Sequence, residues 1–269
     1  MTRVLPTAQF ASIVYGVGGV SLDDPAECFH EASRLYPNVA PPRLEVIEEL
    51  GRDGELARSA VRSSRTHDHR AGVVLPPPRA LRGRLGGVIA SRRSERPEVL
   101  RPVRIRDLAT LLAASCAAVP RGPGLRRPVP SAGALYPLEA YVVAPAVSGL
   151  EPGVYHYDPF RHRLALLGRF AFEDLRETLV DQSLADVTAA LLVVTGVFWR
   201  SRVKYGPRGY RFTLLEAGHL VQNALLASTD LELAALPLGG FHDAMLDRLV
   251  DADGLDEATL YAVVLSGGS

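Results

Sequence analysis

A lysine next to a tyrosine, Lys204-Tyr205, is the residue pair in this chain best suited to moving a proton. The pKa of a lysine amine that is partly removed from water drops toward neutral pH, and a neighbouring phenol can orient the amine or share its proton. The pair closely follows a strongly apolar segment, residues 190–195, and loops after such strands commonly carry function. A charged surface loop has the same composition, so the pair alone marks a candidate for acid–base chemistry.

Arg92-Arg93-Ser94 is the segment best suited to binding a phosphate. A guanidinium binds phosphate oxygens through a planar, bidentate fork, and a serine hydroxyl can complete the shell of donors. The alternative is a solvated basic end of a helix, which also suits the negative end of the helix dipole.

Two further segments could bring backbone amides close to a flat ligand. The first is Pro130-Ser131-Ala132-Gly133, in which small side chains permit close approach and Gly133 can take a positive φ. The second is Pro237-Leu238-Gly239-Gly240, an expected strand end followed by paired glycines whose amides could face the polar edge of a heterocycle. An ordinary loop and a tight turn are the alternatives for the two segments.

Composition and missing motifs argue against several other functions. The formal net charge is zero, so we expect no nucleic acid and no membrane as an electrostatic partner. Neither an apolar run of roughly 18–20 residues nor a signal peptide is visible, so we expect a soluble, cytoplasmic protein. The short cluster at residues 66–69 lacks partner cysteines, and we expect no metal site. There is also no P-loop and no Gly-x-Ser-x-Gly elbow.

The surrounding elements should form one mixed fold behind an N-terminal extension. Pro76-Pro77-Pro78 is a stiff break, which divides the chain into an extension over 1–78 and a main domain over 79–269. Helices and strands alternate irregularly, which favours an α+β fold. We expect helices over 24–36, 43–62, 81–94, 211–229 and from Asp107, strands over 141–144, 154–157, 190–195 and 261–265, and a loop over 121–137.

Taken in order, these segments resemble the nitroreductase superfamily, and most closely its SagB/ThcOx-type dehydrogenases, which oxidise azoline rings to azoles in modified peptides. The resemblance extends over roughly residues 80–266 and is specific as a set, although each piece is weak alone. Besides Arg92-Arg93-Ser94, it is carried by residues 130–139, 149–159, 216–223 and 237–241.

This resemblance implies a nitroreductase fold with a central, mainly antiparallel sheet, and an intertwined homodimer with two FMN sites at the interface. Lys204-Tyr205 stands where the azoline-oxidising enzymes carry a Lys-Tyr pair implicated in catalysis. For the cofactor, the family pattern implies that Arg92, Arg93 and Ser94 hold the phosphate and ribityl chain, that Pro130, Ser131, Ala132 and Gly133 reach in from the partner subunit, and that Pro237, Leu238, Gly239 and Gly240 lie along the isoalloxazine edge.

Two departures from the family pattern affect these expectations. Many nitroreductases carry a basic residue near the C-terminus at the phosphate site, and residues 265–269 contain none. We therefore expect Arg208 or Arg211 to contribute instead, or weaker binding of FMN. The extension over 1–78 is not part of the common core, but residues 29–36 resemble a segment upstream in the azoline-oxidising group, so the extension is a candidate peptide-contacting segment.

The predicted activity is FMN-dependent oxidation of thiazoline or oxazoline rings in a peptide natural product. A base, Lys204 or Tyr205, removes the proton alpha to the ring carbonyl while a hydride leaves to the flavin; which residue is the base stays open. A cyclodehydratase is a candidate partner. The alternatives are an NAD(P)H-dependent nitro- or quinone reductase on the same fold, and a flavin-free scaffold that presents the peptide to a partner.

Overall fold

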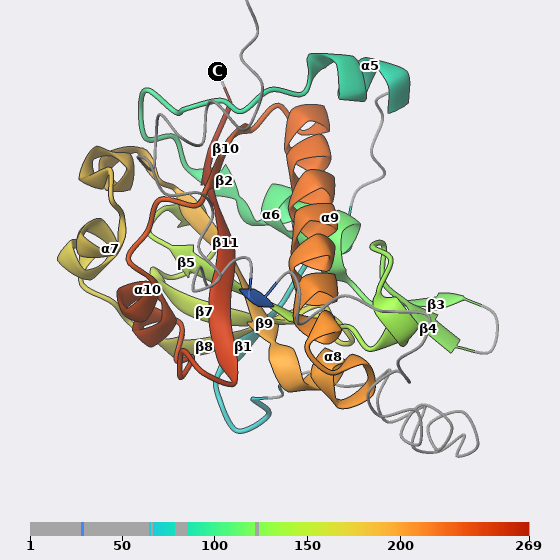
Figure 1. Cartoon of the computed structure of the whole chain (residues 1–269). Helices are drawn as coiled ribbons and strands as arrows, with labels where there is room; N and C mark the ends of the chain where they lie inside the picture. The colour runs from blue at the N-terminus through green and yellow to red at the C-terminus, as the bar shows by residue number, and fades with distance from the viewer. Residues whose placement is uncertain (1–27, 30–64, 66, 79–84, 122–123, 269) are drawn as a thin grey trace, which may run out of the picture.

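A seven-stranded antiparallel sheet forms the centre of the protein (Figure 1). The computed structural model describes residues 28–29, 65, 67–78, 85–121 and 124–268. In spatial order, the strands are β1 (Gly72–Val74), β8 (Arg163–Gly168), β7 (Gly153–Asp158), β5 (Leu138–Ala144), β9 (Ala190–Val197), β11 (Glu257–Ser266) and β10 (Ala234–Leu238). Short ladders join β2 (Val103–Arg104) to β6 (Val147–Ser148) and β3 (Val119–Arg121) to β4 (Gly124–Arg126).

Helices cover both faces of this sheet. One face packs against α6 (Ile105–Cys116) and the long α9 (Arg208–Asp230), and the other against α7 (Phe172–Thr178) and α10 (Asp243–Leu249). The chain also forms α5 (Leu85–Ser91), α8 (Phe198–Tyr205) and the 3-10 turns η1 (Ala132–Ala134) and η2 (Gln182–Val187).

Side chains along β5 point alternately to the two faces of the sheet, so this strand contributes to both halves of the hydrophobic core. Ala140 and Val142 pack with the α6 and α9 side, whereas Tyr141 and Val143 pack with the α7 and α10 side. Strand β9 is apolar over residues 190–194 and buried over residues 190–196, because it lies between two other strands and beneath helices on both faces.

The expected α+β class, the antiparallel sheet and its main strands are confirmed. Strand β1 lies within the expected N-terminal extension and pairs with β8 as an edge strand, whereas the division at 78/79 itself stays a prediction. The helix expected from Asp107 begins two residues earlier, at Ile105. The expected helices over 24–36 and 43–62 lie outside the described residues, apart from helical Cys28 and Phe29.

The predictions of a loop over 121–137 and of a loop at Lys204-Tyr205 were wrong in part. The segment 121–137 contributes to the β3–β4 ladder and contains η1. Lys204 and Tyr205 end the helix α8 instead of lying in a loop, because Phe198 and Ser201, three residues apart, anchor one helical face in the core.

Exposed apolar residues lie on two helices. No residue of α5 is buried, and its Leu85 and Ile89 are exposed. On α9, Leu214, Leu215 and His219 are exposed on one face of the helix. Among the described helices, none is long and apolar enough to cross a membrane.

Candidate active site

The corner between α8 and α9 presents Lys204 and Tyr205. Gly206 ends α8 with φ 57° and ψ −141°, a conformation that strongly favours glycine. Gly209 opens the turn into α9, where an added Cβ would lie 2.8 Å from the backbone of Ser201. Glycine therefore allows the two helices to approach closely, which fixes where the Lys-Tyr pair points.

The loop 130–136 meets this pair in the same chain. A Cβ added at Gly133 would lie 2.7 Å from Tyr205 Oη and 3.1 Å from Lys204 Nζ. The sequence had marked both segments, but nothing in it indicated that they touch. The glycine thus leaves room for the amine and the phenol against the loop backbone.

The loop 130–136 holds its shape against backbone strain. Gly133, Ala134 and Tyr136 have φ values of 62°, 55° and 45°. Positive φ is costly for residues other than glycine and persists only where surrounding contacts enforce it. Here the Ser131 hydroxyl accepts a hydrogen bond from the Tyr136 amide (2.9 Å), and the Tyr136 hydroxyl accepts one from the Arg127 amide (3.3 Å).

The Lys-Tyr pair is partly buried and lies next to the ring of Phe212. Lys204 Nζ lies 5.3 Å from the centroid of the Tyr205 ring, within cation–π range. The Tyr205 ring in turn packs edge-on against Phe212 at 5.1 Å between centroids. The two candidate proton-transfer groups are therefore held beside each other at the loop.

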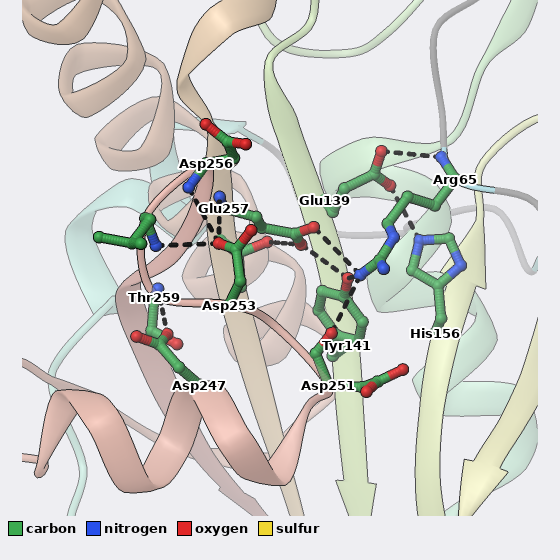
Figure 2. Close-up of polar contacts among 12 residues, drawn as sticks. Arg65, Glu139, Tyr141, His156, Asp247, Asp251, Asp253, Asp256, Glu257 and Thr259 are labelled. Atoms are coloured by element: carbon green, nitrogen blue, oxygen red, sulfur yellow. Dashed lines mark hydrogen bonds and ion pairs between the residues drawn. The ribbon is translucent and has the colours of Figure 1, made fainter.

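Glu139 ties α8 to the sheet. Its buried carboxylate pairs with Arg200 of α8 at 2.5 Å and with His156 Nε2 of β7 at 2.9 Å (Figure 2 draws Glu139 and His156). Burial alone would raise the pKa of this carboxyl, but the His156 hydrogen bond and the charges of Arg200 and Arg127 hold it at about 2. Sequence reasoning assigned no role to Glu139, although a charge inside an apolar strand is a signal that could have identified it.

A second buried carboxylate, Glu257, lies next to the first. It accepts hydrogen bonds of 2.6 Å from both Tyr141 Oη and Thr195 Oγ1. Arg65 joins the two carboxylates, because its guanidinium reaches Glu257 at 3.1 Å while its backbone amide donates to Glu139 at 3.0 Å (Figure 2). Arg65 is therefore anchored in the same charge network as α8.

The predicted phosphate-binding residues follow the end of α5. Arg93 is 75% exposed and pairs with Glu95 at 3.1 Å. A cavity of about 630 Å³ lies here, lined by Arg93, Arg96 and Arg101 and also by Glu95, Glu98 and Glu232, whereas Arg92 and Ser94 are not among its lining residues. Guanidiniums suit an anionic group, but in this chain Arg93 pairs with Glu95 and Arg96 pairs with Asp181 at 2.6 Å.

The predicted flavin-edge residues lie at the end of β10, an edge strand of the sheet. Pro237 and Leu238 close the strand, and the exposed Gly239 and Gly240 follow. No atom of the described residues lies within 4 Å of a Cβ added at Gly239. The backbone here is open to a flat ligand, which fits the predicted cofactor.

The parts of the predicted cofactor site lie apart within one chain. The cavity near Arg93 is lined by Thr229 at the C-terminal end of α9, whereas Lys204 and Tyr205 lie at its N-terminal end (Figure 1). The 23 residues of α9 span roughly 35 Å, so these two groups of residues lie far apart along the helix.

Arg208 and Arg211 lie at the same N-terminal end of α9 as the Lys-Tyr pair. Their guanidiniums lie 5.7 Å from the Phe212 ring and 5.9 Å from the Phe29 ring. Within one chain they therefore lie at the far end of α9 from Arg92-Arg93-Ser94, and their predicted phosphate role stays a proposal.

Comparison with known proteins supplies the family context. The sequence model of the nitroreductase family matches residues 89–268. MJ1384 of Methanocaldococcus jannaschii, assigned as a nitroreductase, is 35% identical over 60% of this chain and 80% of its own length. The microcin B17-processing protein McbC of Escherichia coli is 30% identical over 55% of this chain, which spans 57% of McbC.

Further matches include a peptide-processing protein and two solved structures. The trifolitoxin-processing protein TfxB of Rhizobium leguminosarum is 31% identical over 54% of this chain and 40% of its own length. A nitroreductase-type structure from Anabaena variabilis has a TM-score of 0.63, 24% identity, and covers 75% of this chain and 42% of its own. A chain of the E. coli microcin synthetase McbBCD complex has a TM-score of 0.58 and 22% identity, covering 89% of this chain and 86% of its own.

Proposed function

Because the chain belongs to the nitroreductase family, we propose that it is an FMN-dependent oxidoreductase that oxidises azoline rings of a peptide to azoles. The observation that carries this proposal is the contact of the loop at Gly133 with both Lys204 Nζ and Tyr205 Oη. An oxidation that removes a proton from the substrate needs such a held proton acceptor, whereas a reductase supplied with hydride has no obvious need for one. Similarity to McbC and TfxB, both named for peptide processing, supports the same substrate class.

The proposed cofactor is FMN, which family members usually bind. Arg92, Arg93 and Ser94 would hold its phosphate and ribityl chain; of these three residues, Arg93 lines the cavity next to α5. The exposed backbone of Gly239 and Gly240 would lie along the ring edge. When bound, FMN supplies the acceptor for the hydride that the substrate loses.

A homodimer would complete each site. The loop 130–133 and Arg92-Arg93-Ser94 lie near opposite ends of α9, so one chain does not bring them together. The exposed apolar face of α9 at Leu214 and Leu215 offers a surface for a second copy, whose loop would then reach the first copy's phosphate-binding end. The same arrangement would bring Arg208 or Arg211 of a partner toward that end.

The proposed work of the chain's own residues is proton transfer and orientation. Lys204 or Tyr205 would take the proton alpha to the ring carbonyl, and the other residue would orient it. Aromatisation makes the oxidation favourable, so the site mainly has to hold the ring and accept the proton.

The proposed substrate is a peptide, with a cyclodehydratase as a candidate partner. The matched solved structure is described as the McbBCD complex with a truncated pro-peptide, pro-MccB17, bound. Its alignment covers 89% of this chain, more than the 75% covered by the Anabaena protein. We propose that part of the extension over 1–78 contacts the peptide.

The second candidate function is an NAD(P)H-dependent nitro- or quinone reductase. The similarity to MJ1384, which is assigned as a nitroreductase, favours it. A flavin-free scaffold would have no use for a Lys-Tyr pair held against the loop at Gly133.

The test compares two electron donors on the purified protein. Its absorbance spectrum first establishes whether FMN copurifies. The oxidised protein is then mixed without oxygen with either an azoline-bearing peptide or NAD(P)H, and flavin bleaching is followed. We expect rapid bleaching by the peptide and slow bleaching by NAD(P)H. Faster bleaching by NAD(P)H than by the peptide would support the NAD(P)H-dependent reductase. A colourless protein that takes up no FMN would support the flavin-free scaffold.

A further inference from the structure

Arg200 and Lys204 lie on the same face of α8, because four positions separate them. The Arg200 guanidinium forms an ion pair of 2.5 Å with Glu139, and its side chain is only 15% exposed. Neither proton transfer nor cofactor binding, as proposed above, uses Arg200. The ion pair attaches α8 to the sheet at a point roughly 6 Å along the helix axis from Lys204.

The sheet fixes the position of Glu139. Glu139 is the second residue of β5, the strand that begins directly after the loop 130–136 and Pro137. It lies opposite Thr195 of β9 in the ladder, and the Val197 amide donates to the Pro137 carbonyl at 2.8 Å. An ion pair with Glu139 therefore holds α8 against the part of the sheet from which the loop emerges.

The Glu139 carboxylate has defined partners at both of its oxygens. Oε2 lies 2.9 Å from His156 Nε2, and Oε1 contacts Arg200 and also accepts the Arg65 amide at 3.0 Å (Figure 2 draws Glu139, His156 and Arg65). The side chain is 1% exposed. A carboxylate held in this way presents its charge to Arg200 in one fixed place.

Two segments that lie far apart in the sequence meet twice. At the first meeting, a Cβ added at Gly133 would lie 3.1 Å from Lys204 Nζ. At the second, Glu139, six residues after Gly133, pairs with Arg200, four residues before Lys204. The ion pair thus lies next to the contact that brings the loop to the proposed proton acceptor.

The helix α8 depends on such tertiary contacts. It has eight residues, no side chain caps its N-terminus, and three of its residues are basic whereas none is acidic. Helices this short are marginal in water, and packing decides whether and where they form. Phe198 and Ser201 are buried, and Arg200 adds an ion pair on the face that carries Lys204.

We propose that Arg200 is a positioning residue: its ion pair with Glu139 sets how closely α8 approaches the start of β5, and so holds the Lys204-Tyr205 pair against the loop 130–136. This inference rests on the proposed function of that pair. When the ion pair is lost, the end of α8 can move away from the loop. A displacement of about 1 Å is enough to slow the transfer of a proton strongly.

The experiment uses the full chain loaded with FMN and the variants Arg200→Gln and Arg200→Lys. Each is made in the wild type and in the double variant Lys204→Ala/Tyr205→Phe. The matched control is Arg202→Gln, which removes the same charge from the same helix. Arg202 lies 4.7 Å from the Trp199 ring, and no ion pair joins it to a carboxylate in the described part of the chain.

Two properties are measured. The first is hydrogen exchange of the α8 amides. The second is anaerobic single-turnover flavin reduction by an azoline-bearing peptide, which gives a maximal rate and a half-saturating peptide concentration.

We expect Arg200→Gln to raise exchange at the end of α8 by at least about tenfold, because the Glu139 charge stays buried without its partner. The maximal rate should fall about 10- to 100-fold while the half-saturating peptide concentration stays unchanged. Arg200→Lys should lose about 3- to 10-fold, because an ammonium keeps the charge but lacks the planar fork. Arg202→Gln should match the wild type in both measurements.

The double-variant background separates positioning from general damage to the fold. Because Arg200 acts through the pair, its substitution should not slow further a protein that already lacks the Lys204 amine and the Tyr205 hydroxyl. A loss of the same size in both backgrounds would overturn the inference. So would wild-type exchange in α8, or wild-type rates in both Arg200 variants.

Arg200→Lys keeps a positive charge next to Glu139, so it decides the question even where Arg200→Gln fails to fold. In that case a wild-type rate for Arg200→Lys would overturn the inference. If the wild-type protein oxidises no azoline peptide, the proposed function is wrong, whereas hydrogen exchange still decides whether Arg200 holds α8.

Discussion

Glu139 receives donors from three separate parts of the chain: Arg200 on α8, His156 on β7 and the backbone amide of Arg65. A buried charge is tolerated when it is paired in this way, and removing one partner leaves the other charge uncompensated. At the scale of single residues, Glu139 thus links the helix that ends in the Lys-Tyr pair to the sheet.

Glu139→Gln should lower the free energy of unfolding by about 3–5 kcal/mol, because Arg200 remains buried without its counter-charge. Denaturant unfolding measures the effect, with Glu177→Gln, an exposed glutamate on α7, as the matched control. A loss below about 1 kcal/mol would mean that the Arg200–Glu139 pair contributes little to the fold.

The pH dependence of this contribution has a defined sign. The pKa of Glu139 is about 2 in the folded protein and about 4.3 in an unfolded chain. The stabilisation is therefore complete above about pH 4.3 and is lost as the pH falls through 2. The difference in unfolding free energy between wild type and Glu139→Gln should be constant from pH 5 to 6 and shrink steadily below pH 4. A difference that grows on acidification is the opposite of this expectation.

At the scale of elements, the conformation of the loop 130–136 depends on the residue types at its positive-φ positions, Gly133, Ala134 and Tyr136. Gly133→Ala places a methyl group 2.7 Å from Tyr205 Oη at a φ of 62°, so it should displace the pair. The neighbouring change Ala134→Gly relieves a φ of 55° and should be neutral or stabilising by up to about 1 kcal/mol.

Single-turnover flavin reduction and melting temperature distinguish these two variants. We expect Gly133→Ala to retain FMN and lose at least about tenfold in rate, because small displacements of reacting groups are costly. Ala134→Gly serves as its matched control. Equal rates of flavin reduction for Gly133→Ala and Ala134→Gly would show that the position of the Lys204-Tyr205 pair does not depend on glycine at position 133.

The strands were predictable because their apolar runs are continuous, as in Ala190–Val194 of β9. The helix α8 was not, because its sequence from Trp199 to Tyr205 mixes three charged residues with an incomplete apolar period. The candidate residues were identifiable by type and resemblance. The approach of Gly133 to Lys204, 71 positions apart in the chain, depends on tertiary packing that no local pattern encodes.

At the scale of the whole molecule, the proposed FMN site requires a dimer. Leu215 on α9 is 57% exposed, and the exposed Leu85 and Ile89 lie on α5. Leu215→Arg should separate the copies and reduce FMN occupancy together, because each site would need a loop from the partner.

Light scattering and flavin absorbance measure these two effects. The control is Leu255→Arg, which charges an 84% exposed residue in the turn before β11. If the wild-type protein is monomeric at micromolar concentration and fully loaded with flavin, the FMN site is not shared between two subunits.

The most direct test of the account is anaerobic single-turnover flavin reduction by an azoline-bearing peptide in wild type, Lys204→Ala, Tyr205→Phe and the double variant. We predict that all four proteins bind FMN. Each single variant should lose about 10²–10⁴-fold in rate, as expected on removal of a general base. The double variant should lose little more, because the two residues serve one proton transfer. If both single variants reduce the flavin at the wild-type rate, the Lys204-Tyr205 pair is not the catalytic centre.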